Sequence, residues 1–346
     1  MKSYVFPGII DEKILNIGAQ QILYMRTPEF SSINKESEQM LLDFIGCKDG
    51  KTIIYTGSGT GAMAAVVENY VSTKNKAFVI DGGSFGHRWH QLCDYYGIMH
   101  YTMEIPFAKD IDYGQMEKLI AIEKPDVLLC QHHETSSGQL FDISRIGEIC
   151  KKHHVSLVVD VVSSFLAEDL NMDNMGIDIC LTSTQKGLNI PPGLSIVALS
   201  PKLSEYPWGH SGYYWDFEDN LNNLRRGQTP FSPATTIYLQ LNYRLHQLKE
   251  YGVENNIRDI RERALFFRKL CNKYGWEMPA ETPSMAITAF HVKRNGDKVF
   301  QTLIDDYQTY IMPSSQVGFF RVSHMGIQSE ADLEELAANI HTIEIS

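Results

Sequence analysis

The first two thirds of the chain alternate between two patterns of hydrophobic and polar residues. Apolar residues recur at helical spacing in segments 31–44, 62–70, 88–96 and 143–153. Short, nearly continuous apolar runs cover residues 51–56, 77–80, 127–130, 155–159, 179–181 and 194–199. Strands that are apolar throughout and separated by helices predict a mostly parallel sheet covered on both faces, which is a three-layer α/β domain.

The pattern changes after about residue 235. Long helical patterns cover residues 238–251 and 257–274, strand-like runs cover 286–292 and 318–322, and a helical pattern over 330–343 ends the chain. We therefore expect a large domain over residues 1–234, whose N-terminal segment lines the active site, and a smaller α+β domain over residues 235–346.

Composition and charge exclude several classes of protein. The 346 residues include 31 Lys and Arg against 42 Asp and Glu, a net charge of −11 that disfavours binding to nucleic acid or to an anionic membrane. No apolar run reaches the ~18 residues that span a bilayer, and the N-terminus lacks a secretory signal. The six cysteines form no CxxC pair, which predicts reduced thiols in a cytoplasmic protein.

Polar and glycine-rich residues cluster directly after the predicted strands. They lie at 57–60, 81–85, 132–137, 160 and 182–186. Ligands of open α/β sheets bind beyond the carboxyl ends of the strands, so these five loops predict one shared site.

The first of these loops has the features of a phosphate site. A strand, the glycine-rich turn that begins at Gly57, and a helix N-terminus offer backbone N–H groups and a helix dipole to an anion. Gly57, Gly59 and Ala62 also match the GxGxxA dinucleotide fingerprint, with Asp81 as a candidate ribose ligand. A NAD-dependent enzyme is therefore an alternative at this point.

Two further loops place an acid and an amine at strand ends. Asp160 follows a buried strand, either as a structural turn residue or as the acid that holds a protonated ring nitrogen, as in pyridoxal phosphate enzymes. Lys186 lies 26 residues later between hydroxyl-bearing residues and glycine, where a partly desolvated amine could form a Schiff base.

With these residues in place, the chain resembles the fold-type I, class V aminotransferases that include the alanine–glyoxylate, serine–pyruvate and 2-aminoethylphosphonate–pyruvate enzymes. The matching motifs are TGSGTGAM (56–63), DGGSFGHRW (81–89), HHETSSG (132–138), VVDVVSSF (158–165), TSTQKGLNIPPG (182–193), GQTPFSPA (227–234) and FFRVSHMG (319–326). They occur in family order and cover nearly the whole chain. The resemblance implies a pyridoxal 5'-phosphate enzyme that moves an amino group from alanine, serine or 2-aminoethylphosphonate to pyruvate or glyoxylate.

The resemblance also implies roles for the loop residues. Lys186 would carry the cofactor as a Schiff base and then move the substrate proton, Asp160 would hold the ring nitrogen protonated, and Phe85 would stack on the ring. The other implied cofactor-binding residues are Ser58, Gly59, Thr60 and Gln185 at the phosphate, Ser136 or Thr135 at the ring hydroxyl, and Gln228 and Thr229 reaching the phosphate of the neighbouring subunit. A homodimer with shared active sites follows from that last pair.

Substrate binding is implied for three residues. Arg321 matches the family arginine that grips the substrate carboxylate, and a guanidinium can also grip a phosphonate. Gly8 lies in an N-terminal segment shorter than the family's usual one, and Arg26 lies on a segment that often approaches this site. The histidines show no metal-ligand spacing, so we expect no metal.

Other functions remain as alternatives. A lyase of the same fold, similar to a cysteine desulfurase, would need a mobile cysteine nucleophile, but Cys271, the only cysteine after Cys180, lies in a helical pattern. A non-catalytic protein on this scaffold would not need Lys186 and Asp160.

Overall fold

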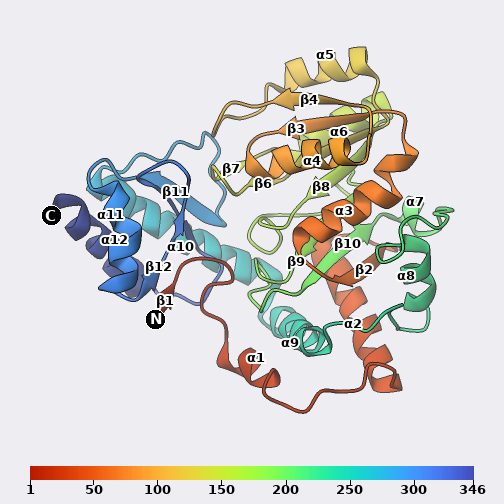
Figure 1. Ribbon diagram of the computed structural model, residues 1–346, viewed down its shortest axis with the longest axis horizontal. Helices are drawn as coiled ribbons and strands as arrows, with labels where there is room; N and C mark the ends of the chain where they lie inside the picture. The colour runs from red at the N-terminus through yellow and green to blue at the C-terminus, as the bar shows by residue number, and fades with distance from the viewer.

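The computed structural model describes all 346 residues and shows a large three-layer domain beside a smaller one (Figure 1). The central sheet has the strand order β2-β10-β9-β8-β5-β3-β4. Its strands are β2 (Lys51–Thr56), β3 (Ala77–Asp81), β4 (His100–Glu104), β5 (Val127–Gln131), β8 (Ser156–Asp160), β9 (Ile179–Ser183) and β10 (Leu194–Leu199). β10 alone runs in the direction opposite to the other strands, so the predicted mostly parallel α/β sheet is confirmed.

The sheet strands are apolar throughout because each one faces two cores. In β5, Leu128 and Cys130 point into one hydrophobic cluster while Val127 and Leu129 point into another. Successive side chains of a strand alternate between the faces of the sheet, so both sets must be apolar when helices cover both faces.

Helices cover the two faces of this sheet. One core receives side chains from α2 (Pro28–Ile45), α5 (Tyr113–Glu123), α6 (Ile143–His153) and α9 (Thr235–Tyr251). The other receives them from α3 (Gly59–Asn69), α4 (Ser84–Tyr95) and α8 (Phe217–Leu224). Short elements complete this part of the chain: α1 (Glu12–Ile17), the 3-10 helix Val71–Thr73, β6 (His133–Glu134), β7 (Gln139–Leu140) and α7 (Pro201–Ser204).

The small domain has its own hydrophobic core. It contains α10 (Val253–Tyr274), α11 (Gly296–Asp305), α12 (Glu330–Ile345), β11 (Ile287–His291), β12 (Thr309–Tyr310), β13 (Met312–Pro313) and β14 (Phe319–Ser323). β14 pairs antiparallel with both β11 and β13. The N-terminal strand β1 (Lys2–Ser3) pairs in parallel with β12, so the start of the chain lies on the small domain (Figure 1).

Packing divides the chain differently from the expected boundary at residue 234. Tyr238, Leu241 and Leu245 of α9 are buried in the core of the main sheet, so the packing changes over at Gly252, between α9 and α10. α9 and α10 have similar helical periodicity. The expected boundary therefore placed both helices in the small domain.

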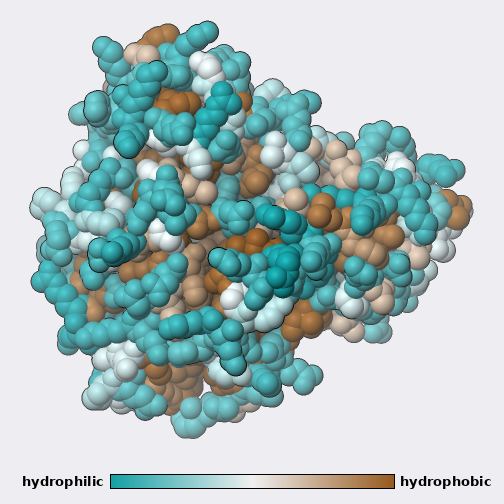
Figure 2. All heavy atoms as spheres, turned by 180° about the vertical axis from the view of Figure 1, so that it is seen from behind, coloured by the Kyte–Doolittle hydropathy of each residue, from teal (hydrophilic) through white to brown (hydrophobic).

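The sequence analysis did not predict four of the longer elements, β4, α5, α8 and α11, or the short elements β1, α1, the 3-10 helix, β6, β7, α7, β12 and β13. β4 has the sequence HYTME and is an edge strand, so most of its residues are only partly buried and form no apolar run. No helix is both long enough and apolar enough to cross a membrane. Seen from behind, the surface is mainly hydrophilic and is interrupted by several apolar patches (Figure 2).

Candidate active site

The five predicted loops meet at one edge of the central sheet. β2, β3, β5, β8 and β9 run in the same direction, so their carboxyl ends lie side by side. Each of these ends carries one of the polar segments that the sequence singled out. The small domain reaches the same edge, since Arg321 of β14 donates to the carbonyl oxygen of Thr135 (3.2 Å).

Asp160 is the last residue of β8 and is almost completely buried. Its side chain accepts one hydrogen bond, from the backbone N–H of Val162 (2.7 Å). Burial raises the pKa of Asp160 to about 7, although the Val162 N–H and the nearby amine of Lys186 favour the charged form. A buried carboxylate with so few partners is suited to hold a cation that the chain itself does not supply.

Lys186 lies in the turn that follows β9, and only 8% of it is exposed. Its Nζ atom lies 3.4 Å from the centroid of the Phe6 ring. Burial lowers the pKa of Lys186 to about 7, with a further contribution from the positive charge of Arg321. Much of this amine is therefore neutral near pH 7, which is the form that acts as a nucleophile or base.

The N-terminal segment closes over Lys186. Asn189 holds it by donating to the carbonyl oxygens of Pro7 (2.6 Å) and Ile9 (3.2 Å). Gly8 has a φ of +81°, and a Cβ there would lie 3.0 Å from Cα of Gly326 in the small domain. Only glycine fits this position, because it must adopt a left-handed conformation against another backbone. Phe6 and Asn189 are two site residues that the sequence analysis missed.

The N-terminus of α3 lies where the sequence predicts an anion site. Ser58 caps the helix, since its hydroxyl accepts from the backbone N–H of Gly61 (3.3 Å). A Cβ on Gly59 would approach Val162 to 2.9 Å, so glycine allows the helix to start against the Asp160 loop. The hydroxyl of Thr60 accepts from Arg88 (2.8 Å).

Arg88 is a further residue that the sequence analysis missed. It lies one turn after Phe85 on α4, with its guanidinium 5.0 Å from the centroid of the Phe85 ring. The i, i+3 spacing of Phe85 and Arg88 could have indicated that Arg88 belongs to the site, because this spacing places both side chains on one face of the helix. The helix dipole of α3 and the charge of Arg88 together favour a phosphate at Thr60.

Glu134 positions the start of α4. Its buried carboxylate accepts from the backbone N–H groups of Phe85 and Gly86 (3.1 Å each) and from the hydroxyl of Ser136. Burial raises the pKa of Glu134, and these donors oppose the shift. The hydroxyl of Thr135 donates to Ser163 (2.7 Å). Both candidates for the ring-hydroxyl contact thus also have partners within the chain.

Arg321 is half-buried, and its guanidinium has no carboxylate partner. Its hydrogen bonds go to the carbonyl oxygens of Thr135 (3.2 Å) and Pro313 (2.7 Å), and its buried Nε atom has no partner. Burial lowers its pKa, while the charge of Glu134 opposes that shift. The two carbonyls fix the orientation of the guanidinium without neutralising it, so it can bind an anion.

Arg26 makes a different set of contacts from those expected of a substrate ligand. It donates to the side-chain oxygen of Gln228 (3.0 Å) and to the carbonyl oxygens of Thr229 (2.6 Å) and Pro230 (3.3 Å). Arg26 therefore fixes the segment predicted to cross to a neighbouring subunit. Gln185 is half-buried directly before Lys186.

Comparison with known proteins identifies the family of this chain. Residues 18–312 match the family described as aminotransferase class-V, and the chain belongs to this family. An uncharacterised aminotransferase of Methanocaldococcus jannaschii is 28% identical, over 98% of this chain and 90% of the relative. The serine–glyoxylate aminotransferase of Hyphomicrobium methylovorum is 27% identical, over 88% of this chain and 80% of the relative.

A solved structure supports the fold. The aspartate aminotransferase of subgroup IV from Thermus thermophilus superimposes with a TM-score of 0.90 at 23% identity, covering 99% of this chain and 98% of that one. The predicted fold-type I architecture is confirmed, and the protein is an aminotransferase, not a NAD-dependent enzyme.

Proposed function

We propose that this aminotransferase uses pyridoxal 5'-phosphate to move an amino group from a small amino acid to pyruvate or glyoxylate. The observation that carries the proposal is the pairing of two buried groups at one sheet edge. Lys186 has a lowered pKa and Asp160 a raised one, and Arg321 stands nearby as a cation without a counterion. An amine, an acid and an anion site are what a transaminase requires.

The residues present fit the cofactor. The start of α3, with Ser58, Thr60 and Arg88, would hold its phosphate. Asp160 would bind the ring nitrogen, where a proton would supply the cation that this buried carboxylate lacks. Lys186 would bond covalently to the cofactor's carbonyl carbon, and Phe85 would contact the ring.

The chemistry then divides between cofactor and protein. Bound pyridoxal phosphate supplies a ring that accepts electrons from the substrate's Cα. Lys186 would take the proton from the substrate's Cα and give it up again within the same half-reaction, and it would move a proton in the opposite direction in the second half-reaction. Arg321 holds the substrate's anionic group so that the Cα–H bond faces this amine. Phe6 covers Lys186 and limits access of water.

The substrate class follows from Arg321 and from the relatives. A single guanidinium without a counterion binds one small anion, either a carboxylate or a phosphonate. The Hyphomicrobium relative is named for serine and glyoxylate. We therefore propose alanine, serine or 2-aminoethylphosphonate as donor and pyruvate or glyoxylate as acceptor.

The lyase alternative has less support. A cysteine desulfurase needs a cysteine that reaches the cofactor, and all six cysteines of this chain are buried free thiols. Cys271 lies inside the core of the small domain, where burial raises the pKa of its thiol to about 12. A buried thiol of this kind is a poor nucleophile.

Donor and acceptor panels test the proposed activity. With cofactor added, we expect amino transfer from at least one of the three donors to pyruvate or glyoxylate, measured as the new amino acid formed. Lys186→Ala should abolish this transfer, whereas Lys202→Ala, which removes an exposed lysine paired with Asp178, should not change it. Absence of transfer with every pair, or full activity in Lys186→Ala, would contradict the proposal.

The proposed assembly is a homodimer with shared sites. Arg26 holds Gln228 and Thr229 in place beside the end of β2, where Ala234 donates to the hydroxyl of Thr56 (2.9 Å). Exposed side chains surround this segment. Ile22 and Tyr24 lie just before Arg26 in the sequence, and the rings of Tyr213 and Tyr214 contact the ring of Phe231. Large exposed apolar and aromatic groups favour an interface at this face.

Mixing two inactive variants tests the shared site. A Lys186→Ala chain combined with a Thr229→Ala chain gives heterodimers with one intact site and one doubly damaged site. Activity of the mixture should therefore exceed that of either parent. Unchanged activity after subunit exchange has been verified by mass would indicate that each site is built from one chain.

We also propose that the protein works in the cytoplasm. The six buried free thiols support a reducing compartment, where cysteines are kept from forming disulfides.

A further inference from the structure

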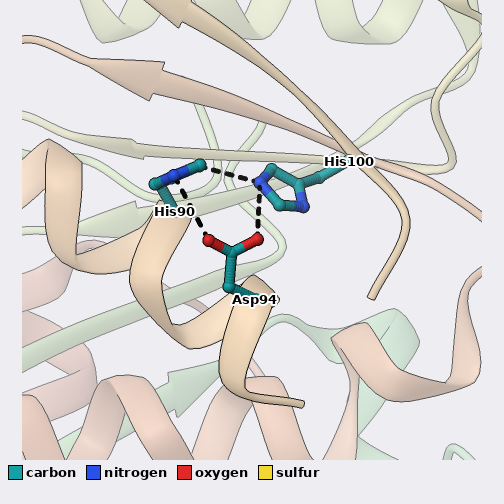
Figure 3. A group of neighbouring side chains, drawn as sticks. All are labelled: His90, Asp94 and His100. Carbon is teal, nitrogen blue, oxygen red and sulfur yellow. Dashed lines mark hydrogen bonds and ion pairs between the residues drawn. The ribbon is translucent and has the colours of Figure 1, made fainter. Parts of the chain in front are cut away.

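A second group of chemically active side chains lies away from the proposed active site. His90 and Asp94 are on the last two turns of α4, and His100 is the first residue of β4. Because β4 runs parallel to β3, His100 lies at the opposite end of the sheet from the carboxyl edge that carries Lys186. Figure 3 shows the three side chains pointing toward one another.

The ligand atoms of the three residues all lie within 4.8 Å of one another. His90 Nδ1 is 2.9 Å from His100 Nε2, and His90 Nε2 is 3.4 Å from Asp94 Oδ2. Asp94 Oδ1 is 3.8 Å from His100 Nε2. The spacing of four residues on α4 puts His90 and Asp94 on one helix face, and β4 brings the third side chain to them.

The tautomer of His100 is fixed by the backbone. His100 Nδ1 lies 2.9 Å from the carbonyl oxygen of Ile98, so Nδ1 carries the proton and Nε2 presents its lone pair to His90 and Asp94. A backbone carbonyl that orients a histidine in this way is typical of metal-binding imidazoles. Thr102, on the same face of β4, places its hydroxyl 3.1 Å from His90 Nδ1 and helps to orient the second ring.

We propose that His90, Asp94 and His100 bind a divalent transition metal of the zinc type. Two imidazole nitrogens and a carboxylate, with water as the fourth ligand, match the donor set and coordination number of zinc. In a tetrahedral site with Zn–N distances of about 2.0–2.1 Å the two nitrogens stand about 3.3 Å apart, so the two rings need to separate by only a few tenths of an ångström. Nδ1 of His90 becomes a ligand by moving its proton to Nε2, which faces Asp94.

The proposal does not depend on the cofactor. A metal here would join the C-terminal half of α4 to the edge strand β4. The ligand spacing His-x3-Asp-x5-His gave no signal in the sequence because the third ligand lies on a different element, in a strand that was itself not predicted.

Zinc binding to the holoenzyme tests this site. After chelator treatment and dialysis, titration with Zn²⁺ against a chromophoric chelator should show one tight equivalent per chain. His100→Gln and Asp94→Asn should each weaken the affinity for Zn²⁺. Loss of a residue that only hydrogen-bonds to a ligand lowers metal affinity by roughly 10- to 100-fold, and loss of a ligand itself should cost at least as much. His246→Gln removes a half-exposed histidine paired with Glu36 and is the matched control, with unchanged affinity.

Two further measurements separate binding at this site from binding elsewhere. Co²⁺ in place of Zn²⁺ should give the intense visible bands of a four-coordinate site, and Asp94→Asn should remove them. Zn²⁺ should raise the thermal midpoint of the wild-type protein but not that of Asp94→Asn, whose exposed side chain can change without disturbing the fold. The proposal would be overturned if the chain bound no stoichiometric equivalent of Zn²⁺, or if the variants and the wild type bound Zn²⁺ with equal affinity. The three residues would then form only a hydrogen-bonded cluster at the surface.

Discussion

Replacing Asp160 with asparagine should remove most of the transaminase activity and make the cofactor-free protein more stable. Asparagine has nearly the same shape but cannot hold a neighbouring cation. Loss of one partner from a buried charge pair costs about 3–5 kcal/mol, or roughly a 10²- to 10⁴-fold decrease in kcat/KM at 1.36 kcal/mol per decade. The stability gain follows because the chain no longer has to bury an unpaired carboxylate.

The gain in stability should depend on pH with a defined sign. The pKa of Asp160 is about 7 in the folded chain and 3.8 ordinarily, so between these values the folded protein retains a proton that the unfolded chain has lost. Stability of the wild-type apoprotein therefore falls as pH rises through this window, and the full penalty is present above about pH 7. Three pKa units correspond to on the order of 4 kcal/mol.

Denaturant unfolding of the two apoproteins measures this effect. Asp160→Asn should be more stable than wild type at pH 8, and the difference should shrink toward zero near pH 4. Asp160→Glu keeps the charge but displaces it, and serves as the comparison for both activity and stability. An active Asp160→Asn enzyme within a few-fold of wild type, or one destabilised at pH 8, would show that Asp160 is a structural turn residue.

Replacing Arg321 with alanine should have the second large effect. Removing a charge-assisted contact at a partly buried site costs about 2–5 kcal/mol, or roughly a 30- to several-thousand-fold decrease in kcat/KM. Arg321→Lys should recover only part of the loss, since an ammonium group cannot form two parallel hydrogen bonds to a carboxylate or phosphonate. Cofactor binding should be unchanged, because the phosphate site that we propose lies at the start of α3.

Both kcat/KM and the absorbance of the bound cofactor need to be measured for Arg321→Ala, so that a loss of substrate binding can be told from a loss of cofactor. Arg145→Ala, which removes an exposed arginine packed on Tyr113, is the matched control and should behave as wild type. Normal kcat/KM in Arg321→Ala, or loss of the bound cofactor itself, would assign Arg321 to structure and not to the substrate.

The parts of the fold that could be predicted are those with strong local patterns. The buried strands of the main sheet carry continuous apolar runs, and their ends carry Asp160 and Lys186, so strand prediction and site prediction supported each other. β4 could not be found in the same way, because an edge strand has one partly exposed face and needs no apolar run. The packing of α9 against the main sheet could not be predicted either, because the period of a helix does not reveal which core the helix faces.

Contacts between distant segments were the features that sequence could not predict. Asn189 lies in the recognised lysine motif, yet only the folded chain shows that it holds Pro7 and Ile9. Arg26 was expected at the substrate, and the structure places it on Gln228 and Thr229. In both cases the side chain donates hydrogen bonds to groups some 180 to 200 residues away in the sequence. A local sequence pattern cannot predict such a partner.

The central claim is that Lys186 carries the cofactor, and borohydride trapping tests it most directly. Reduction of the holoenzyme, followed by digestion and mass spectrometry of the peptides, should place a single pyridoxyl group on Lys186. The label should be absent when the substrate amine is added before reduction, because the amine releases the lysine. A pyridoxyl group on any other lysine, or none on the chain while the cofactor is bound, would contradict the account.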